Sequence, residues 1–169
     1  MAIEDFQQAI SKDDQCIEAF FHIGTSKLKS NQIKEAIEDF NQAYNLDENI
    51  PGILDGLGQC FHALRQYDDA LDHFKNALSK DPTNVEFLKN RSATYYDLKM
   101  YDESARDLDK ALEKDPNDAQ VLYKLGLTFY AHQKYKKCIK TLKAALKNNP
   151  LQSIEADIYY HIGLAYCRV

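Results

Sequence analysis

This sequence contains five histidines and four cysteines, the residues best suited to chemistry. They lack the spacing of a catalytic or metal-binding site. A helical metal site places histidines four residues apart, and a nucleophile needs a neighbouring base. No two histidines have that spacing, no cysteines form a CxxC pair, and no glycine-rich phosphate loop occurs. We therefore expect a chain that is not an enzyme and that holds no metal or cofactor. The residues concerned are His22, His62, His73, His132, His161, Cys16, Cys60, Cys138 and Cys167.

The composition favours a protein partner over nucleic acid or a membrane. The formal net charge is −5 and the charges are interspersed, which disfavours binding to phosphate backbones or to anionic lipid. The stretch MAIEDFQQAI lacks the basic segment and apolar run of a signal peptide. No apolar stretch approaches the ~20 residues that cross a bilayer. Cysteines without pairing motifs are typical of a reduced, intracellular chain, so we expect a cytoplasmic location.

Small and apolar residues recur every 34 positions, and this period gives each side chain a position within a repeat. Self-similarity at a fixed period of this size indicates stacked repeats rather than a compact globule. One set of small residues is Ala2, Ala36, Ala70, Ser104 and Cys138, followed four residues later by Phe6, Phe40, Phe74, Leu108 and Leu142. A second small set is Gly24, Gly58, Ser92 and Gly126.

Each repeat has the pattern of two short helices. In residues 85–118, apolar residues fall at helical spacing in both halves, and Pro116 then disfavours continuation of the helix. Asn117 or Asp118 can cap the next helix through a side-chain oxygen. A glycine within a helix costs about 1 kcal/mol relative to alanine, so its recurrence in register indicates close approach of another helix. We expect an all-α fold of helix-turn-helix repeats.

This pattern resembles the tetratricopeptide repeat, or TPR. The family scheme is a large residue, Leu-Gly, an aromatic residue, then Ala, Phe or Tyr, Ala and Pro across 34 residues. It is matched by Leu54, Leu57, Gly58, Phe61, Ala70, Phe74, Ala77 and Pro82, and again by Leu122, Leu125, Gly126, Phe129, Cys138, Leu142, Ala145 and Pro150. The resemblance implies a right-handed α-solenoid in which the first helix of each pair lines a concave groove. Arg91 departs from the scheme, since it replaces the usual leucine.

The register divides the chain into one array of four complete repeats between two single helices. After Pro150 the register slips by three residues, and the pattern restarts at Ala156. We read the chain as a piece of a longer array. The expected segments are 1–16 (an unpaired second helix), 17–50, 51–84, 85–118, 119–152 and 153–169 (an unpaired first helix, from about Glu155).

The register also predicts which residues line the groove. Its C-terminal half is aromatic with cations nearby, a composition that suits capture of a peptide or helix from another protein. The alternative is that these tyrosines pack against the next helix. The candidate binding residues are Lys89, Asn90, Tyr96, Tyr123, Lys124, Leu127, Tyr130, Tyr160, His161 and Arg168.

Three functions fit such an array. The first is a non-catalytic interaction scaffold, and the second is the targeting arm of an enzyme whose catalytic domain lies outside this chain. The third is a chaperone co-factor, since some family members hold a C-terminal carboxylate in a clamp of Lys, Asn and Arg side chains. Asn90 and Lys124 match that clamp. The other places hold Asp55, which would repel a carboxylate, Gln59 and Gln120.

The two unpaired terminal helices predict a second interaction. Each keeps the core pattern, so one end of a chain could complete the repeat of another chain, head to tail. The alternative is that both ends pack only on their neighbours and tolerate exposure. The residues of this predicted self-association are Ile3, Phe6 and Ile10, with Tyr159, Ile162 and Tyr166.

Overall fold

The chain is a succession of helices, which confirms the predicted all-α class. A computed structural model describes residues 2–13 and 15–169, except for the side chains of residues 2, 3 and 9. Over this part of the chain there are ten helices and no strand. They are α1 (Ala2–Lys12), α2 (Ile17–Lys29), α3 (Ile33–Leu46), α4 (Pro51–Ala63), α5 (Tyr67–Lys80), α6 (Val85–Asp97), α7 (Tyr101–Lys114), α8 (Ala119–Ala131), α9 (Tyr135–Lys147) and α10 (Gln152–Tyr166).

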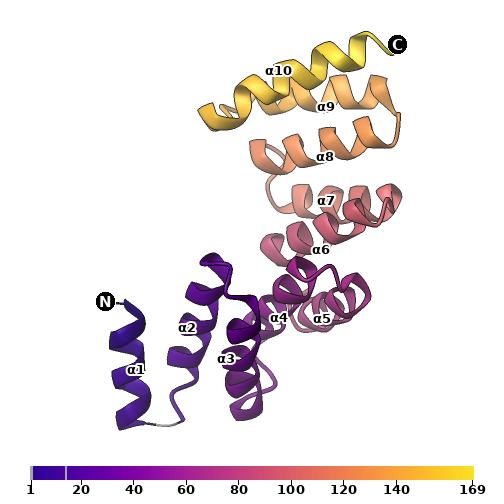
Figure 1. Ribbon diagram of the computed structural model, residues 1–169. Helices are drawn as coiled ribbons and strands as arrows, with labels where there is room; N and C mark the ends of the chain where they lie inside the picture. Colours follow the sequence, from indigo (N-terminus) through magenta and orange to yellow (C-terminus); the bar gives the residue numbers. More distant parts are fainter. Residues whose placement is uncertain (1, 14) are drawn as a thin grey trace. The chain divides into compact units, whose positions relative to one another are not determined.

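The helices belong to two compact units, Met1–Pro82 and Thr83–Val169. In the first unit α1 packs on α2, α2 on α3, α3 on α4 and α4 on α5. In the second unit α6 to α10 pack on one another in the same sequential way (Figure 1). None of the helices described is both long and apolar enough to cross a membrane.

The two helices of each pair are joined by a tight turn with a left-handed residue. Asn31, Arg65, Lys99 and Gln133, which lie 34 residues apart, have φ between 59° and 62°. The amide of the following residue donates to a carbonyl five residues earlier, as Gln32 does to Lys27 at 2.9 Å. This is the hydrogen bond of a Schellman motif, which closes the end of the first helix. The turns therefore repeat in register although no glycine marks them.

The recurring glycines mark close helix contacts, as predicted. A Cβ at Gly58 would stand 2.6 Å from the Phe74 ring, and one at Gly126 would stand 2.3 Å from Leu142. Phe74 and Leu142 are fully buried. Helix α4 thus approaches α5, and α8 approaches α9, closely enough to exclude a methyl group.

Arg91, which replaces the usual leucine, joins α6 to α7 through a charged pair. Its Nε donates to Oδ2 of Asp107 and its Nη2 to Oδ1, both at 2.7 Å. The hydrogen bond to Asp107 is the main cause that raises the pKa of Arg91. A two-point ion pair therefore takes the place of an apolar contact in this repeat.

The last helix differs from the expectation in two ways. It begins at Gln152 rather than near Glu155, because no helix-breaking residue separates these two positions. Of the residues predicted to keep its core pattern, Ile162 is buried, but Tyr159 and Tyr166 are 58% and 55% exposed. Ile158, which the pattern did not single out, is fully buried instead. The two tyrosines are exposed because α10 packs on α9 and α8 with its Ile158 and Ile162 face.

Candidate functional site

A pocket of about 160 Å³ lies among α6, α7 and α8. We call it the α6–α8 pocket. Of the residues predicted to bind a partner, Tyr96, Lys124 and Leu127 line it. The remaining lining residues are Ser92, Ala93, Asp97, Ser104, Leu108 and Thr128.

The deeper wall of the α6–α8 pocket is apolar or already hydrogen-bonded. Leu108, Ser104 and Thr128 are buried. The hydroxyls of Ser104 and Thr128 lie 3.3 Å apart, and Thr128 also donates to the Lys124 carbonyl at 2.9 Å. Ser92 donates to the Lys89 carbonyl at 2.8 Å. Because these hydroxyls already have partners, the pocket suits an apolar side chain better than a polar one.

Helix caps hold the walls of the α6–α8 pocket in place. Oδ1 of Asn84 accepts from the amides of Glu86 and Phe87, at 3.1 and 3.3 Å, at the start of α6. Oδ1 of Asp118 accepts from the amides of Gln120 and Val121, at 2.9 and 3.0 Å, at the start of α8. Of the two residues considered for the α8 cap, Asp118 fills that role.

Two lysines, Lys124 and Lys89, lie near each other beside the α6–α8 pocket. Burial, and then the charge of Lys89, lower the pKa of Lys124, while the charge of Glu86 opposes them. Nζ of Lys89 lies 2.7 Å from Oε1 of Glu86. An acidic group on a ligand near Lys124 would relieve the repulsion between the two ammonium groups.

Three of the other predicted residues pack between α8 and α10. The hydroxyl of Tyr123 donates to Asp157, whose carboxylate also lies 3.1 Å from Nδ1 of His161. Burial first, and then this hydrogen bond, raise the pKa of Tyr123 to about 12. The His161 ring meets the edge of Tyr130 with the centroids 5.5 Å apart. Tyr123 and Tyr130 thus take part in helix packing, which was the alternative for the tyrosines, and His161 packs beside them.

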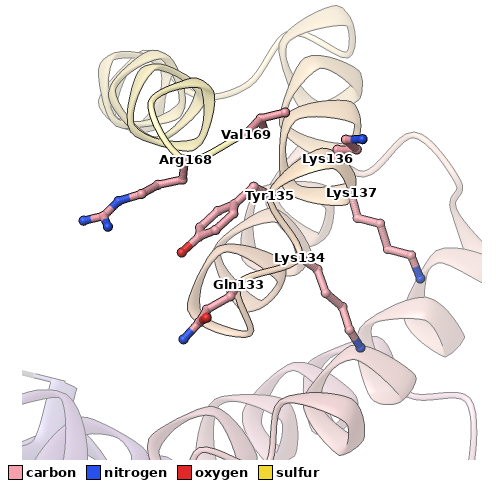
Figure 2. A pocket seen from close by; sticks show the side chains of 7 residues that line it. All are labelled: Gln133, Lys134, Tyr135, Lys136, Lys137, Arg168 and Val169. Atoms are coloured by element: carbon pink, nitrogen blue, oxygen red, sulfur yellow. The ribbon is translucent and has the colours of Figure 1, made fainter.

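Two further predicted residues lie apart from the α6–α8 pocket. Tyr160 is 62% exposed on α10, where its ring meets His161. Arg168 follows the end of α10 and lines a different, open pocket of about 420 Å³ (Figure 2). We call this the terminal pocket, and its other lining residues are Gln133, Lys134, Tyr135, Lys136, Lys137 and Val169.

The sequence alone did not identify the second-helix side of the α6–α8 pocket. Ser104 and Leu108 carry the signature of core positions, and both are buried. A gap beside a core residue depends on the lengths of the neighbouring side chains, which the period does not encode.

The predicted residue Asn90 lies half-buried in α6.

In α4, two places of the carboxylate clamp are occupied by residues that bond to each other. Nε2 of Gln59 donates to Oδ2 of Asp55 at 2.7 Å, and Asp55 is buried. A second carboxylate there would meet negative charge instead of the positive charge that a clamp needs.

Two of the four cysteines, Cys60 and Cys138, are buried as free thiols. Burial raises the pKa of Cys60 to about 12 and that of Cys138 to about 11. Both therefore stay protonated at neutral pH, and Cys138 is the buried filler that its place in the repeat predicts. No group of three or more histidine, cysteine or acidic side chains that could hold a metal occurs among the residues described.

Comparison with protein families places repeats of one kind along the chain. Models described as "Tetratricopeptide repeat" match residues 17–50, 56–84 and 120–151. A model described as "TPR repeat" matches residues 93–133. No curated protein sequence shows significant similarity to the chain.

Solved structures with the same fold are similar over most of the chain. YrrB, described as a TPR protein with an unusual peptide-binding site, is 19% identical, with a TM-score of 0.77 over 98% of this chain and 84% of its own. TTC0263, a TPR protein of Thermus thermophilus, is 19% identical, with a TM-score of 0.79 over 98% and 89%. The Cut9–Hcn1 hetero-tetramer of the APC/C is 22% identical, with a TM-score of 0.84 over 96% of this chain and 32% of that chain.

Proposed function

Because the chain belongs to the tetratricopeptide repeat family, we propose that it is a non-catalytic scaffold for protein–protein interaction. It binds a peptide or helix of a partner protein on the face formed by α6, α8 and α10. The α6–α8 pocket is the observation that carries this proposal, since it is an apolar recess whose hydroxyls are already satisfied. Peptide binding by YrrB, a protein of the same fold, supports the proposal.

The chemistry of the face defines the peptide that would fit it. An apolar side chain of the ligand enters the α6–α8 pocket between Tyr96 and Leu127. Acidic residues beside that anchor face Lys124 and Lys89. Tyr160 extends the same face along α10 with an exposed aromatic ring. Buried apolar anchors supply most of the affinity in such contacts, and charges at the rim supply specificity.

A display library of random peptides, selected on the full chain, tests this proposal. The peptides enriched should share an apolar residue next to an acidic one. Leu127→Arg fills the α6–α8 pocket with a charge and should weaken their binding at least about tenfold. Lys110→Ala, at an exposed position of α7, is the matched control and should leave the affinity unchanged.

Two results would contradict groove binding. One is that the library yields no binder although the chain is folded by circular dichroism. The other is that Leu127→Arg binds the enriched peptides as well as Lys110→Ala does. In the second case the contact lies elsewhere on the chain.

We also propose a second protein contact, head to tail between copies of the chain, in which α1 of one copy meets α10 of another. Its support is the exposure of Tyr159 and Tyr166, two large rings at places in the repeat where the core normally lies. The residues assigned to it are those of the sequence prediction, Ile3, Phe6, Ile10, Tyr159, Ile162 and Tyr166. The side chain of Ile3 falls outside the described residues.

A further inference from the structure

We propose that α7, α8 and α9 form a further binding site, which takes an acidic segment of a partner protein through an apolar side chain of that segment. The site is a groove of about 330 Å³, which we call the α7–α9 groove. It goes beyond the function proposed above, because it is separate from the α6–α8 pocket. It forms where α9 departs from the second helices of the other repeats.

The α7–α9 groove lies among packed helices of the second unit. Helix α8 packs on both α7 and α9, and these two pack in turn on α6 and α10 (Figure 1). The floor of the groove is formed by Leu122, Leu125 and Phe129 of α8. At 3.6 residues per turn, these three lie on the side of α8 opposite to Leu127, which lines the α6–α8 pocket. The two sites are therefore on different faces of the same helix.

The α7–α9 groove is open because α9 carries a short residue, Thr141, at a place where other second helices carry one that reaches the first helix. The equivalent residues all contact the first helix of their own pair, Asp39 on Lys27, His73 on Phe61 and Asp107 on Arg91. Thr141 lines the groove, and its side chain has no hydrogen bond in the described part of the chain. Ala144, three residues later, also replaces longer residues, which are Gln42, Asn76 and Lys110.

The charge of the second helix reverses at α9. This helix contains five lysines and no acidic residue, whereas α3, α5 and α7 each contain at least three acidic residues. Two of the lysines, Lys137 and Lys140, line the α7–α9 groove. The equivalent residues are Glu35, Asp69 and Glu103 for Lys137, and Glu38, Asp72 and Arg106 for Lys140. One wall of the groove is thus basic where the other repeats are mostly acidic.

The two lysines of this wall are available to an acidic ligand. Both are exposed, and neither forms an ion pair among the described residues. Nζ of Lys137 stands 5.5 Å from the centroid of the Phe129 ring, a cation–π contact that holds the ammonium group over the floor of the groove. A carboxylate of the ligand could pair with Lys137 while this contact persists.

The opposite wall of the α7–α9 groove sets the direction of the ligand. Asp109 of α7 lies there. Burial raises the pKa of Asp109, and the positive charge of Lys137 opposes that rise. A carboxylate of the ligand would be repelled by Asp109 and attracted by the lysines, so the acidic residues of the ligand lie along α9.

The floor of the groove favours a peptide over other anions. Leu122 and Leu125 are buried side chains of α8, and the half-buried ring of Phe129 extends the apolar surface that they form. An apolar side chain that covers this surface supplies affinity, and the charges beside it supply specificity. A nucleic acid or a lipid headgroup has no apolar side chain to place there and would bring phosphate close to Asp109.

Two variants remove the groove and its charge by restoring residues of the other repeats. Thr141→His recreates the stack that His73 makes on Phe61, and so fills the groove. A histidine with the ordinary pKa of about 6.5 is mostly neutral at about pH 7.5, so this variant keeps the charge of the chain. Lys137→Glu combined with Lys140→Asp, the double lysine variant, gives α9 acidic residues at the places where α3 and α5 carry them.

Each variant has a matched control. Thr141→Val changes the same residue to one of similar size, so the groove stays open. Lys34→Glu combined with Lys75→Glu changes the net charge as much as the double lysine variant does, at exposed positions of α3 and α5.

A subtractive selection from a display library of random peptides tests the proposal. The library is passed over the Thr141→His chain, which removes peptides that bind elsewhere, and is then selected on the full wild-type chain. The enriched peptides should carry several acidic residues around an apolar one. Their affinity should fall at least about tenfold in the double lysine variant and stay unchanged in both controls and in Leu127→Arg.

Circular dichroism checks that each variant is folded. Thr141→His should fold, because α5 accommodates a histidine at the same place in the repeat. If it does not fold, the double lysine variant takes its place in the subtraction step, since Lys137 and Lys140 are exposed.

Three results would overturn the proposal. The first is that no peptide is enriched after the subtraction step, and the second is that the double lysine variant binds the enriched peptides as well as the wild-type chain does. The third is that Leu127→Arg weakens them, since they would then bind in the α6–α8 pocket. If single-stranded RNA or phosphatidylserine vesicles bind where no peptide does, and the double lysine variant loses that binding, the lysines of α9 serve a polyanion instead.

Discussion

Two glycines at equivalent places in the repeat, Gly58 and Gly163, meet opposite surroundings. Gly58→Ala should destabilise the chain by about 1–3 kcal/mol, because the buried Phe74 ring stands 2.6 Å from the new Cβ. Gly163→Ala should stabilise it by up to about 1 kcal/mol, because alanine is the better helix former and the site is open. Urea denaturation followed by circular dichroism measures both. If the two substitutions changed the free energy of unfolding equally, Gly163 would be packed against a large side chain as Gly58 is.

His73 makes part of the stability dependent on pH. Its ring stacks on Phe61 with the centroids 5.1 Å apart and the planes 6° apart. Burial lowers the pKa of His73, although the charges of Asp69 and Asp72 oppose this effect. A lowered pKa means that the fold favours the neutral ring. The stability that His73 contributes is therefore present above the unfolded pKa of about 6.5 and is lost as the pH falls below it.

Replacing this histidine tests that sign. His73→Phe keeps a stacked ring without a titrating group, so its free energy of unfolding should fall less between neutral pH and pH values below about 6 than that of the wild-type chain. Denaturation at a series of pH values measures the difference. His22→Phe is the matched control, because His22 is exposed and also stacks on a phenylalanine, Phe6. The same reduction in both variants would show that the effect does not come from burial of His73.

Single residues show what a sequence can and cannot predict about a site. The period identified Gly58, Phe74 and Cys138 as contact positions, because steric exclusion between two helices restricts residue size at every repeat. It could not separate Tyr96, which lines a pocket, from Tyr123, which bonds to Asp157. Both are tyrosines on first helices, and their roles depend on which neighbour reaches them.

At the scale of the helix, the residues that interrupt or cap a helix predicted most of the helix boundaries. Proline and asparagine or aspartate between pairs correspond to the starts of α6 and α8, where a side chain accepts amide hydrogen bonds. The start of α10 was predicted three residues late. The link from Gln152 to Glu155 contains no proline or glycine, so those residues join the helix instead of forming a loop.

The contribution of the α8 cap to stability can be measured by substitution. Asp118→Ala removes the carboxylate that accepts from the amides of Gln120 and Val121, and should cost about 1 kcal/mol. Asn117→Ala is the matched control, since Asn117 is exposed and its side chain does not cap α8 in the described structure. Thermal denaturation compares the two. A cost that is the same for both variants would assign the effect to the turn and not to the cap.

At the scale of the whole molecule, the charge is unevenly distributed along the sequence. Residues 1–82 contain seven basic and fifteen acidic residues, whereas residues 83–169 contain fourteen basic and eleven acidic residues. The formal net charge of −5 describes the whole chain and does not show this difference between its two parts. The acidic first part and the more basic second part would attract each other in the proposed contact between copies, and salt should weaken that contact, since the Debye length falls to about 3 Å at 1 M salt.

Association of this kind also links stability to concentration. A contact that forms only between folded chains stabilises the folded state by mass action. The midpoint of thermal unfolding of the wild-type chain should therefore rise with protein concentration, and the rise should shrink at high salt. Tyr159→Arg, which places a charge on the proposed α10 contact, should unfold at one temperature whatever the concentration. A wild-type midpoint that does not move would contradict self-association through α1 and α10, whereas the same rise in Tyr159→Arg would place the contact between copies on another surface.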